Sequence, residues 1–200
     1  MAVKSNLTNM VLVLSLTCLL CSAILGGAYA LTKEPIDAAA AAKTDRSIGE
    51  VLPAFASTSK ESVAVGEKEY AYYKALDEKG APVGYAIEST TVGFGGNLTL
   101  MVGITPDGVV YNTSVLSQSE TPGLGAKCST DPKFMAQWKG FDPSVKILSV
   151  KKDGGDVDAI TASTITSRAY TLAVENALAA FKVILNESEE SDSCGGEDHE

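Results

Sequence analysis

A run of twenty uncharged residues, from Val11 to Ala30, constrains this chain more than any other feature. Leucine, valine, isoleucine, alanine and glycine dominate the run, and its length is what an α-helix needs to cross the hydrocarbon core of a bilayer. A cleaved signal peptide is the alternative, because Ala28-Tyr29-Ala30 has the Ala-x-Ala pattern of a cleavage site. Signal peptides normally have a shorter apolar region, so the sequence favours a retained transmembrane anchor over residues 10–31.

The charges beside the apolar run indicate its orientation. Lys4 and the α-amine precede the run, whereas Lys33 on the other side is offset by Glu34. Positive charge beside a spanning helix is retained on the cytoplasmic side. We therefore expect residues 1–9 to be a short cytoplasmic start, with a single pass through the bacterial cytoplasmic (inner) membrane. The rest of the chain would then lie on the outer (periplasmic) face.

Composition limits the nature of the chain beyond the anchor. About 165 residues remain, enough for one domain with a real core. The formal net charge is -9, and the last fourteen residues contain seven acids and no Lys or Arg, so the rest of the chain is near neutral at -9 + 7 = -2. There is no basic face for nucleic acid. The acidic segment 187–200 is expected to be a disordered, solubilising tail.

The histidine and cysteine content excludes several kinds of site. The chain has a single histidine, His199, next to the C-terminus. A histidine-based catalytic dyad, triad or zinc site in the core is therefore excluded, and no catalytic or metal-binding residues are nominated. Cys18 and Cys21 lie inside the apolar run. A disulfide between Cys128 and Cys194 is open in an external compartment, although nothing in the spacing demands it.

The pattern of apolar and turn residues predicts an α+β fold, in which one N-terminal transmembrane helix precedes a single domain with a mainly antiparallel sheet and flanking helices. Residues 32–60 are interpreted as a helical linker and 61–186 as the domain. Strands are expected over 69–77, 83–92, 98–105, 109–116 and 145–151. Helices are expected over 36–51, 131–139 and 169–185, the last with Leu172, Val174, Ala177, Leu178, Phe181, Ile184 and Leu185 on its apolar face.

The segment from Asp158 to Ser167 is unusually rich in hydroxyl groups. It places five Ser or Thr residues in ten positions, directly before the longest helical pattern of the chain. Backbone N–H groups at a helix start are unpaired and the helix dipole favours negative charge there, so a phosphate could bind at this place. The plainer interpretation is a structural N-cap, for which Ser and Thr are preferred residues.

Two further segments are rich in turn residues. In Glu120-Thr121-Pro122-Gly123-Leu124-Gly125 the Pro-Gly pair indicates a type II turn, because glycine supplies the positive φ that this turn requires. Gly93-Phe94-Gly95-Gly96 indicates a flexible connection between two strands. Each segment is compatible with an ordinary turn and, for Phe94, with core packing.

Asp158-x-x-Thr161-Ala162-Ser163-Thr164 resembles the flavinylation motif of the FMN-binding domain family, Asp-x-x-Ser/Thr-Gly/Ala-Ala-Thr. In that family a dedicated flavin transferase joins FMN through its phosphate to the hydroxyl of the last threonine. The resemblance implies covalent FMN on Thr164, surrounded by Thr161, Ala162, Ser163 and Ser167. It also implies that Asp158 binds the transferase's metal or orients the loop. The family usually has alanine where this chain has Ser163, which adds a second hydroxyl beside the acceptor.

Glu120-Thr121-Pro122-Gly123-Leu124-Gly125 resembles a second motif of the same family, which forms a loop around the flavin. This implies flavin-site roles for Glu120, Thr121, Gly123, Leu124 and Gly125. The Gly93–Gly96 segment is similar to the family's Gly-aromatic-x-Gly segment near the cofactor, which adds Phe94 and Gly95. The family often has histidine two residues before the glutamate, and Gln118 stands there in this chain. An amide does not titrate near neutral pH, so a proton-linked role is not implied.

Taken over its whole length, the chain is similar to the G subunits of the Rnf ion-translocating electron transport complexes. The resemblance implies a membrane-anchored electron carrier with covalent FMN, working with the other subunits of a ferredoxin:NAD oxidoreductase and matured by a flavin transferase. Such a chain would be an electron-transfer subunit of a translocase rather than a stand-alone enzyme. The alternatives are a relative of the C subunits of the Na⁺-translocating NADH:quinone reductases, a stand-alone extracytoplasmic flavin carrier, and an unflavinylated anchored binding domain.

Overall fold

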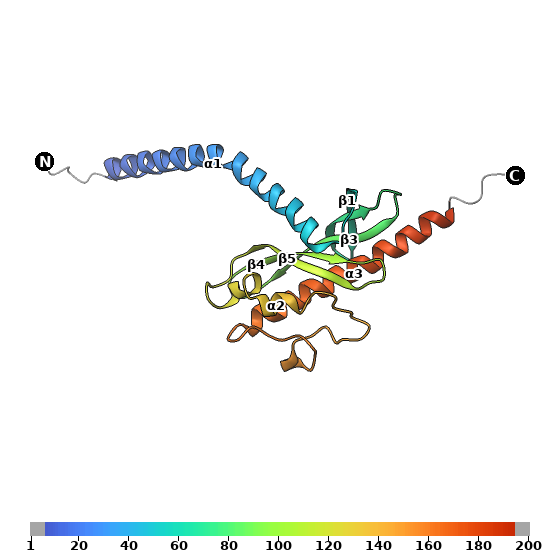
Figure 1. Ribbon diagram of the computed structural model, residues 1–200. Coiled ribbons are helices and arrows are strands. Elements are labelled where there is room, and N and C mark those ends of the chain that lie inside the picture. Colours follow the sequence, from blue (N-terminus) through green and yellow to red (C-terminus); the bar gives the residue numbers. More distant parts are fainter. Residues whose placement is uncertain (1–6, 195–200) are drawn as a thin grey trace. The chain divides into compact units, whose positions relative to one another are not determined.

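A computed structural model describes residues 7–194 (Figure 1), so parts of the expected cytoplasmic start and acidic tail lie outside the described residues. The chain divides into two compact units, one up to Lys43 and one from Thr44 onward, and each is described by itself. The elements in order are α1 (Leu7–Val51), β1 (Ser57–Val65), β2 (Lys68–Leu76), β3 (Pro82–Val92), β4 (Asn97–Ile104), β5 (Val110–Gln118), η1 (Gly125–Ser129), α2 (Pro132–Ala136), η2 (Lys151–Asp153) and α3 (Thr164–Cys194).

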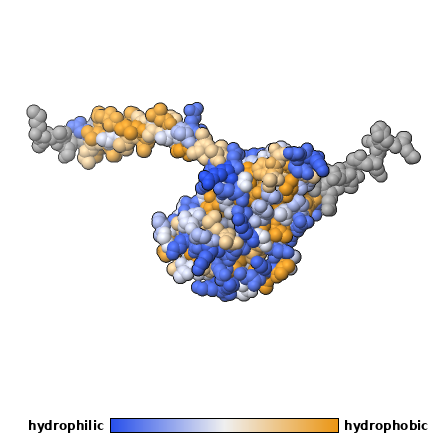
Figure 2. All heavy atoms as spheres, in the orientation of Figure 1, coloured by the Kyte–Doolittle hydropathy of each residue, from blue (hydrophilic) through white to orange (hydrophobic). Residues whose placement is uncertain are grey.

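The first unit consists of α1 as far as Lys43. This part of the helix is long and apolar enough to cross a membrane, and its large apolar side chains are exposed (Figure 2). Thr17 keeps its hydroxyl within the helix by donating to the carbonyls of Val13 and Leu14, at 3.0 and 2.9 Å. Internal pairing of this kind allows a polar side chain to lie in an apolar surrounding. The observed helix therefore has the length and surface expected of the predicted anchor.

The second unit contains a five-stranded antiparallel sheet in the order β1-β2-β3-β4-β5. Because each strand pairs with the next one along the chain, the connections are short. The four strands expected between residues 69 and 116 correspond to β2–β5, with ends that differ by one or two residues. The expected α+β architecture with a mainly antiparallel sheet is confirmed.

The two faces of the sheet are covered by different helices. On β4, Leu100 and Val102 belong to the cluster that packs against α3, whereas Met101 between them belongs to a cluster with Ile48 and Val51 of α1. Successive side chains on a strand point to opposite faces, so this alternation follows from the period of two. A side chain at Gly103 would overlap the carbonyl oxygen of Val51, which explains a glycine within this strand.

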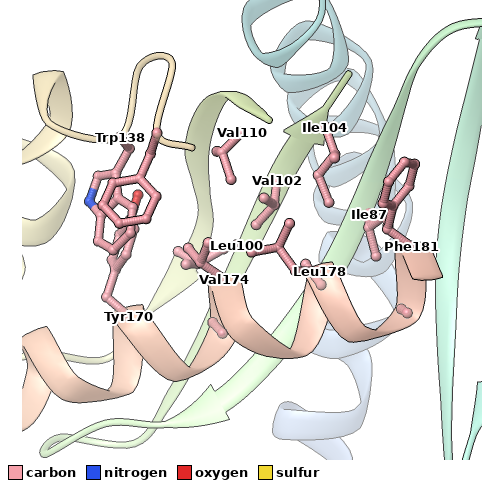
Figure 3. Close-up of a cluster of buried hydrophobic side chains, with 14 of the residues drawn as sticks. Ile87, Leu100, Val102, Ile104, Val110, Trp138, Tyr170, Val174, Leu178 and Phe181 are labelled. Atoms are coloured by element: carbon pink, nitrogen blue, oxygen red, sulfur yellow. The ribbon is translucent and has the colours of Figure 1, made fainter. Parts of the chain in front are cut away.

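Helix α3 covers the other face of the sheet with the apolar positions predicted from its spacing. Val174, Leu178 and Phe181 point toward the strands (Figure 3), and Ala177 and Ile184 are buried with them. The prediction that Leu172 lies on the buried apolar face is wrong, because this residue is 48% exposed. The helix is longer than expected in both directions. It continues to Cys194, through the start of the segment expected to be disordered, because no glycine or proline interrupts it before Gly195.

The sequence prediction differs most from the structure in residues 32–60, which were interpreted as a helical linker. The helix in it ends at Val51, and residues 57–65 form β1 instead. This strand is polar, and Val63 is its one buried residue. Because it is an edge strand, its backbone pairing with β2 does not depend on an apolar alternation in its sequence. The compact unit accordingly begins at Thr44 and not at 61.

The strand expected over 145–151 is absent from the described structure. Val145 and Ile147 are exposed, and pairing is limited to a single parallel bridge between Val150 and Val157. The backbone here bonds to the nearby residues 155–157 and to aspartate side chains, and not to a strand of the sheet. Asp156 accepts from the Ile147 N–H at 2.7 Å, and Asp142 does the same for Ser144 at 2.8 Å. The apolar alternation therefore belongs to a loop that aspartates stabilise, and not to a strand.

An aromatic cluster ties the segment between β5 and α3 to the rest of the domain. Asp131 caps α2 by accepting from the Lys133 N–H, and α2 ends at Ala136 rather than at the expected residue 139. Trp138 stacks on Tyr170 of α3, with 5.1 Å between ring centroids (Figure 3), and Phe134 meets the same ring edge-on. These contacts hold the long connecting segment against the first half of α3, where the candidate site lies.

Candidate functional site

The chain folds back on itself immediately before α3. Ser167, in the first turns of the helix, accepts a hydrogen bond from the backbone N–H of Ile160 at 2.8 Å and donates to the carbonyl of Ser163 at 3.0 Å. The backbone N–H of Ser163 donates to the carbonyl of Ile160 at 3.0 Å and closes the turn. The loop 158–163 is thus fixed by hydrogen bonds between its backbone and Ser167 of the helix that follows it.

Ala162 has an unusual backbone conformation within this loop. Its φ is 62°, which makes it the only non-glycine residue with positive φ in residues 7–194. The left-handed region is unfavourable for residues with a Cβ atom, whereas glycine adopts it freely. The Gly/Ala position of the motif therefore coincides with a backbone conformation that glycine adopts without strain. The conformation directs Ser163 and Thr164 along the start of α3.

A buried carboxylate joins three segments at this point. Glu120 is only 6% exposed, and its Oε1 accepts from the backbone N–H of Phe94 at 2.8 Å. Its Oε2 accepts from the hydroxyl of Thr166 at 2.9 Å. Thr166 in turn accepts from the hydroxyl of Ser163 at 2.8 Å. The Gly93–Gly96 turn, the loop after β5 and the start of α3 are therefore connected through one side chain.

The glycines of the two turn-rich segments are needed for this close packing. A side chain on Gly93 or Gly125 would overlap the carboxylate of Glu120, and one on Gly95 would overlap the carbonyl oxygen of Ser119. Gly123 is different, because it has open space around it and a φ of 78°. The Leu124 N–H donates to the Thr121 carbonyl at 3.1 Å across it. This is the geometry of the type II turn that the Pro-Gly pair predicts.

These segments enclose a hollow of about 370 Å³, within the range of small-molecule sites. It is lined by Phe94, Glu120, Thr121, Leu124, Gly125, Ala162, Ser163, Thr164 and Ile165. The lining is mostly apolar, and Phe94, Leu124 and Ile165 remain 69%, 44% and 52% exposed. An apolar wall that stays open to solvent is suited to a flat, partly apolar ligand.

The structure brings together most of the residues that the sequence nominated. Eight of them line the hollow, whereas Gly95, Gly123, Asp158, Thr161 and Ser167 are absent from its lining. Asp158 is exposed and forms an ion pair with Lys151 at 2.7 Å. Gln118, which replaces the family's histidine, accepts from the backbone N–H of Glu120 at 2.7 Å. Sequence reasoning missed Ile165 in the lining and Thr166 beneath it.

The two adjacent hydroxyl residues at the start of α3 differ in environment. Ser163 is 8% exposed and donates its hydrogen bond inward, to Thr166. Thr164 is half-buried, and its oxygen accepts from the ammonium group of Lys152 at 3.3 Å. Lys152 belongs to η2, which begins within the segment expected to be a strand. No spacing in the sequence indicates that it would meet Thr164.

Burial and the charge of Glu120 raise the pKa of the Cys128 thiol to about 11. This cysteine is fully buried and is a free thiol. Because a thiol with this pKa remains protonated at neutral pH, Cys128 is not a reactive thiolate next to the hollow. The half-buried Thr164, which lines the hollow, is more accessible than this fully buried cysteine.

Comparison with known proteins gives matches over the same region. The FMN-binding domain family matches residues 93–179, which include every nominated site residue. The chain is 32% identical over 183 residues to the G subunit of the ion-translocating oxidoreductase complex of Methanosarcina acetivorans, with 89% of this chain and 96% of that protein covered.

Two further proteins are similar to this chain. The G subunit of the proton-translocating ferredoxin:NAD(+) oxidoreductase complex of Clostridium ljungdahlii is 33% identical over 168 residues, with 82% of this chain and 86% of that protein covered. A solved structure of the C subunit of the Na(+)-translocating NADH-quinone reductase from Parabacteroides distasonis aligns with a TM-score of 0.48 and 23% identity. That alignment covers 70% of this chain and 81% of the other.

Proposed function

Because this chain belongs to the family of G subunits of ion-translocating oxidoreductase complexes, we propose that it is the FMN-carrying electron-transfer subunit of such a complex. One relative bears the name of a ferredoxin:NAD(+) oxidoreductase subunit. When bound, FMN accepts and passes on one or two electrons. The polypeptide supplies the attachment, the orientation and the surroundings of the flavin, and it acts with the other subunits of the complex.

The hollow between the two turn-rich segments fits an FMN group. Its exposed apolar wall of Phe94, Leu124 and Ile165 suits one face of an isoalloxazine ring, which has a large flat apolar surface. The hollow is also lined by Thr164, whose hydroxyl accepts from the Lys152 ammonium group, a pairing that suits a phosphate. Apolar and phosphate-binding groups, which the two parts of FMN require, therefore meet at this hollow.

We propose further that the link is covalent, a phosphodiester on the hydroxyl of Thr164. The observation that carries this proposal is the contrast between two neighbouring hydroxyls. Ser163 is almost buried, and its hydroxyl donates to Thr166 beneath it, so its proton is already engaged in a buried hydrogen bond. Thr164 lines the same hollow, and its described side-chain contact is with the exposed Lys152 rather than with an inward partner. The burial pattern thus supports Thr164 as the acceptor.

A flavin transferase would make the link, and the loop before Thr164 is accessible to a second protein. The side chain of Asp158 is 72% exposed, and Thr161 is exposed beside it. Neither residue lines the hollow, so their place in the motif is better explained by maturation than by contact with the bound flavin. Their replacement should slow attachment and leave an already attached flavin unaltered.

We also propose that the first part of α1 is retained as a single-pass anchor and that the domain lies on the outer face of the cytoplasmic membrane. The length and exposed apolar surface of the helix support an anchor. N-terminal sequencing of the protein from its native membrane should find residues before Val11. A mature chain that starts near Leu31 would contradict retention.

The attachment can be tested with the full chain produced together with a flavin transferase. Wild type and Ser163→Ala should show flavin fluorescence on a denaturing gel, since only Thr164 is required as acceptor. Thr164→Val, which keeps the shape of the side chain and removes its hydroxyl, should show none. Fluorescence retained in Thr164→Val and lost in Ser163→Ala would move the attachment to Ser163. No fluorescence in the wild type would contradict a covalent link.

A further inference from the structure

We infer that Lys152 binds the flavin phosphate at Thr164, an inference that rests on the proposed attachment. The ammonium group of Lys152 donates to Thr164 Oγ1 at 3.3 Å, the same oxygen that would form the ester bond to phosphorus. A cation within contact of the ester oxygen also lies within reach of the non-bridging phosphate oxygens, because those oxygens are bonded to the same phosphorus atom. Lys152 precedes Thr164 by twelve residues and lies outside the flavinylation motif.

The position of Lys152 is fixed by the residue that follows it. Asp153 accepts two hydrogen bonds from the guanidinium group of Arg168, both at 2.7 Å. Arg168 lies in the first turns of α3, so this bidentate pair holds η2 against the helix start. Gly154, with φ of 85°, turns the chain away immediately afterwards. Lys152 is thereby carried on a short segment that is anchored to the same helix as Thr164.

The charges around Lys152 leave it available for an anion. Arg168 occupies both carboxylate oxygens of Asp153, and Asp158 pairs with Lys151 at 2.7 Å. Lys152 is close enough to lower the pKa of Asp153, but its described hydrogen bond goes to Thr164. Of the three cations near the start of α3, Lys152 is therefore the one whose described contact is a neutral hydroxyl.

A phosphodiester on Thr164 would supply a negatively charged partner for the Lys152 ammonium group. It carries one negative charge spread over two non-bridging oxygens, and a lysine ammonium group offers three donors for such a compact anion. The site is exposed, so the interaction should be modest and should weaken with added salt. Its effect is to hold the phosphate end of the flavin in one place, while the apolar wall of the hollow holds the ring.

The test compares the full-length Lys152→Met protein with wild type, each with and without attached flavin. Thr164→Val supplies the flavin-free background. We expect flavinylation to raise the melting temperature of wild type, and expect this gain to fall by about 1–3 °C in Lys152→Met. In the Thr164→Val background the same substitution should leave the melting temperature unchanged. Lys152→Arg, which keeps the charge, should retain the gain.

Two further measurements separate a phosphate contact from a structural effect. The ³¹P resonance of the folded wild type should differ from that of the urea-unfolded protein, and Lys152→Met should move it toward the unfolded position. Lys151→Met is the matched control, because its partner is Asp158; it should change neither the gain nor the resonance. Should folded Lys152→Met take up no flavin while Lys152→Arg is fully loaded, that result also supports the charge contact.

The outcomes distinguish this inference from the attachment itself. A wild-type chain without flavin would contradict attachment at Thr164, on which the inference depends. A loaded wild type with equal melting-temperature gain and identical ³¹P resonance in Lys152→Met would contradict the role of Lys152 and leave the attachment standing. A Lys152→Arg protein that behaves as Lys152→Met would also overturn the charge contact.

Discussion

The first turns and the second half of α3 are held to the domain by different chemistry. From Ala177 to Ile184 the helix contacts the sheet through apolar side chains that are almost completely buried. At its start, hydroxyl groups of Ser163 and Thr166 form a chain that ends on the carboxylate of Glu120. One helix therefore belongs to the hydrophobic core from Ala177 to Ile184 and to a buried polar network at its start.

Because of this difference, the two regions contribute differently to the stability of the domain and to the positioning of groups at the candidate site. Apolar burial is non-directional and scales with the area removed from water, so the second half of α3 contributes stability without fixing any atom closely. Hydrogen bonds weaken steeply with angle and distance, so the network at the helix start fixes where each hydroxyl points. We therefore expect substitutions in the two regions to affect stability and the flavin site in different proportions.

The largest loss of stability is expected from Phe181→Ala. The ring is 3% exposed and meets Tyr85 edge-on, with 5.4 Å between centroids. Truncating a buried phenylalanine costs about 3–5 kcal/mol through lost burial and the cavity that remains. Urea unfolding should show this loss, while the flavin absorption spectrum of the folded protein stays unchanged. A shifted flavin spectrum with little loss of stability would remove the distinction between the two regions.

Glu120→Ala should affect the flavin site more, and the stability of the domain less, than Phe181→Ala does. It leaves the Phe94 N–H and the Thr166 hydroxyl without their acceptor, at a cost of about 1–3 kcal/mol for an unsatisfied buried group. The flavin spectrum should shift, because the Gly93–Gly96 turn is no longer tied to α3. Glu120→Gln is the matched control, since it keeps the shape and one acceptor oxygen. Equal spectra for wild type and Glu120→Ala would show that the network does not position the flavin.

Gly123→Val tests the turn beside the hollow through backbone strain alone. Its φ of 78° resists a β-branched residue at a cost of about 1–3 kcal/mol, and no neighbouring atom blocks a side chain. Gly80→Val is the matched control, with a φ of 82° and equally open surroundings. Gly80 lies before β3, roughly 35 Å along that strand from the Gly93 turn. Both variants should lose similar stability, but Gly123→Val alone should shift the flavin spectrum and potential. Identical flavin properties in the two variants would make residues 120–125 an ordinary turn.

The smallest effect concerns pH and the Asp153–Arg168 pair. Hydrogen bonds from Arg168 hold the pKa of Asp153 below its ordinary value of 3.8. On acidification the unfolded carboxylate binds its proton first, so the stability that the pair contributes is present above pH 3.8 and is lost as pH falls through the lower folded value. The melting temperature of wild type should therefore exceed that of Asp153→Asn at pH 6, and the difference should shrink as pH falls through the folded-state pKa of Asp153. A difference that persists at low pH would assign the effect to something other than this carboxylate.

Much of the fold follows from local pattern. Strands β2–β5 and α3 have apolar periodicities that place them correctly, although α3 extends further at both ends, because each packs a face against the core. The edge strand β1 could not be found this way, since backbone pairing with β2 determines it and only Val63 is buried. The alternation around Val145 and Ile147 was misleading because both side chains are exposed and the backbone there bonds within its own loop and to aspartate side chains.

Those parts of the candidate site that are formed by contiguous segments of the sequence were predictable. The segments around Gly93, Glu120 and Thr164 each have a recognisable order of residues, and the fold brings them to one hollow. The contacts between segments were not predictable. Glu120 with Thr166, and Lys152 with Thr164, arise only from how the loops cross, and no spacing along the chain encodes them.

The central claim is that Thr164 carries FMN, and peptide mass mapping of the protein from its native membrane tests it most directly. We predict that the peptide containing Thr164 has the added mass of an FMN phosphoryl group, with fragment ions that place it on Thr164 rather than on Ser163. An unmodified Thr164 peptide as the main species, from membranes in which the complex is active, would contradict the account.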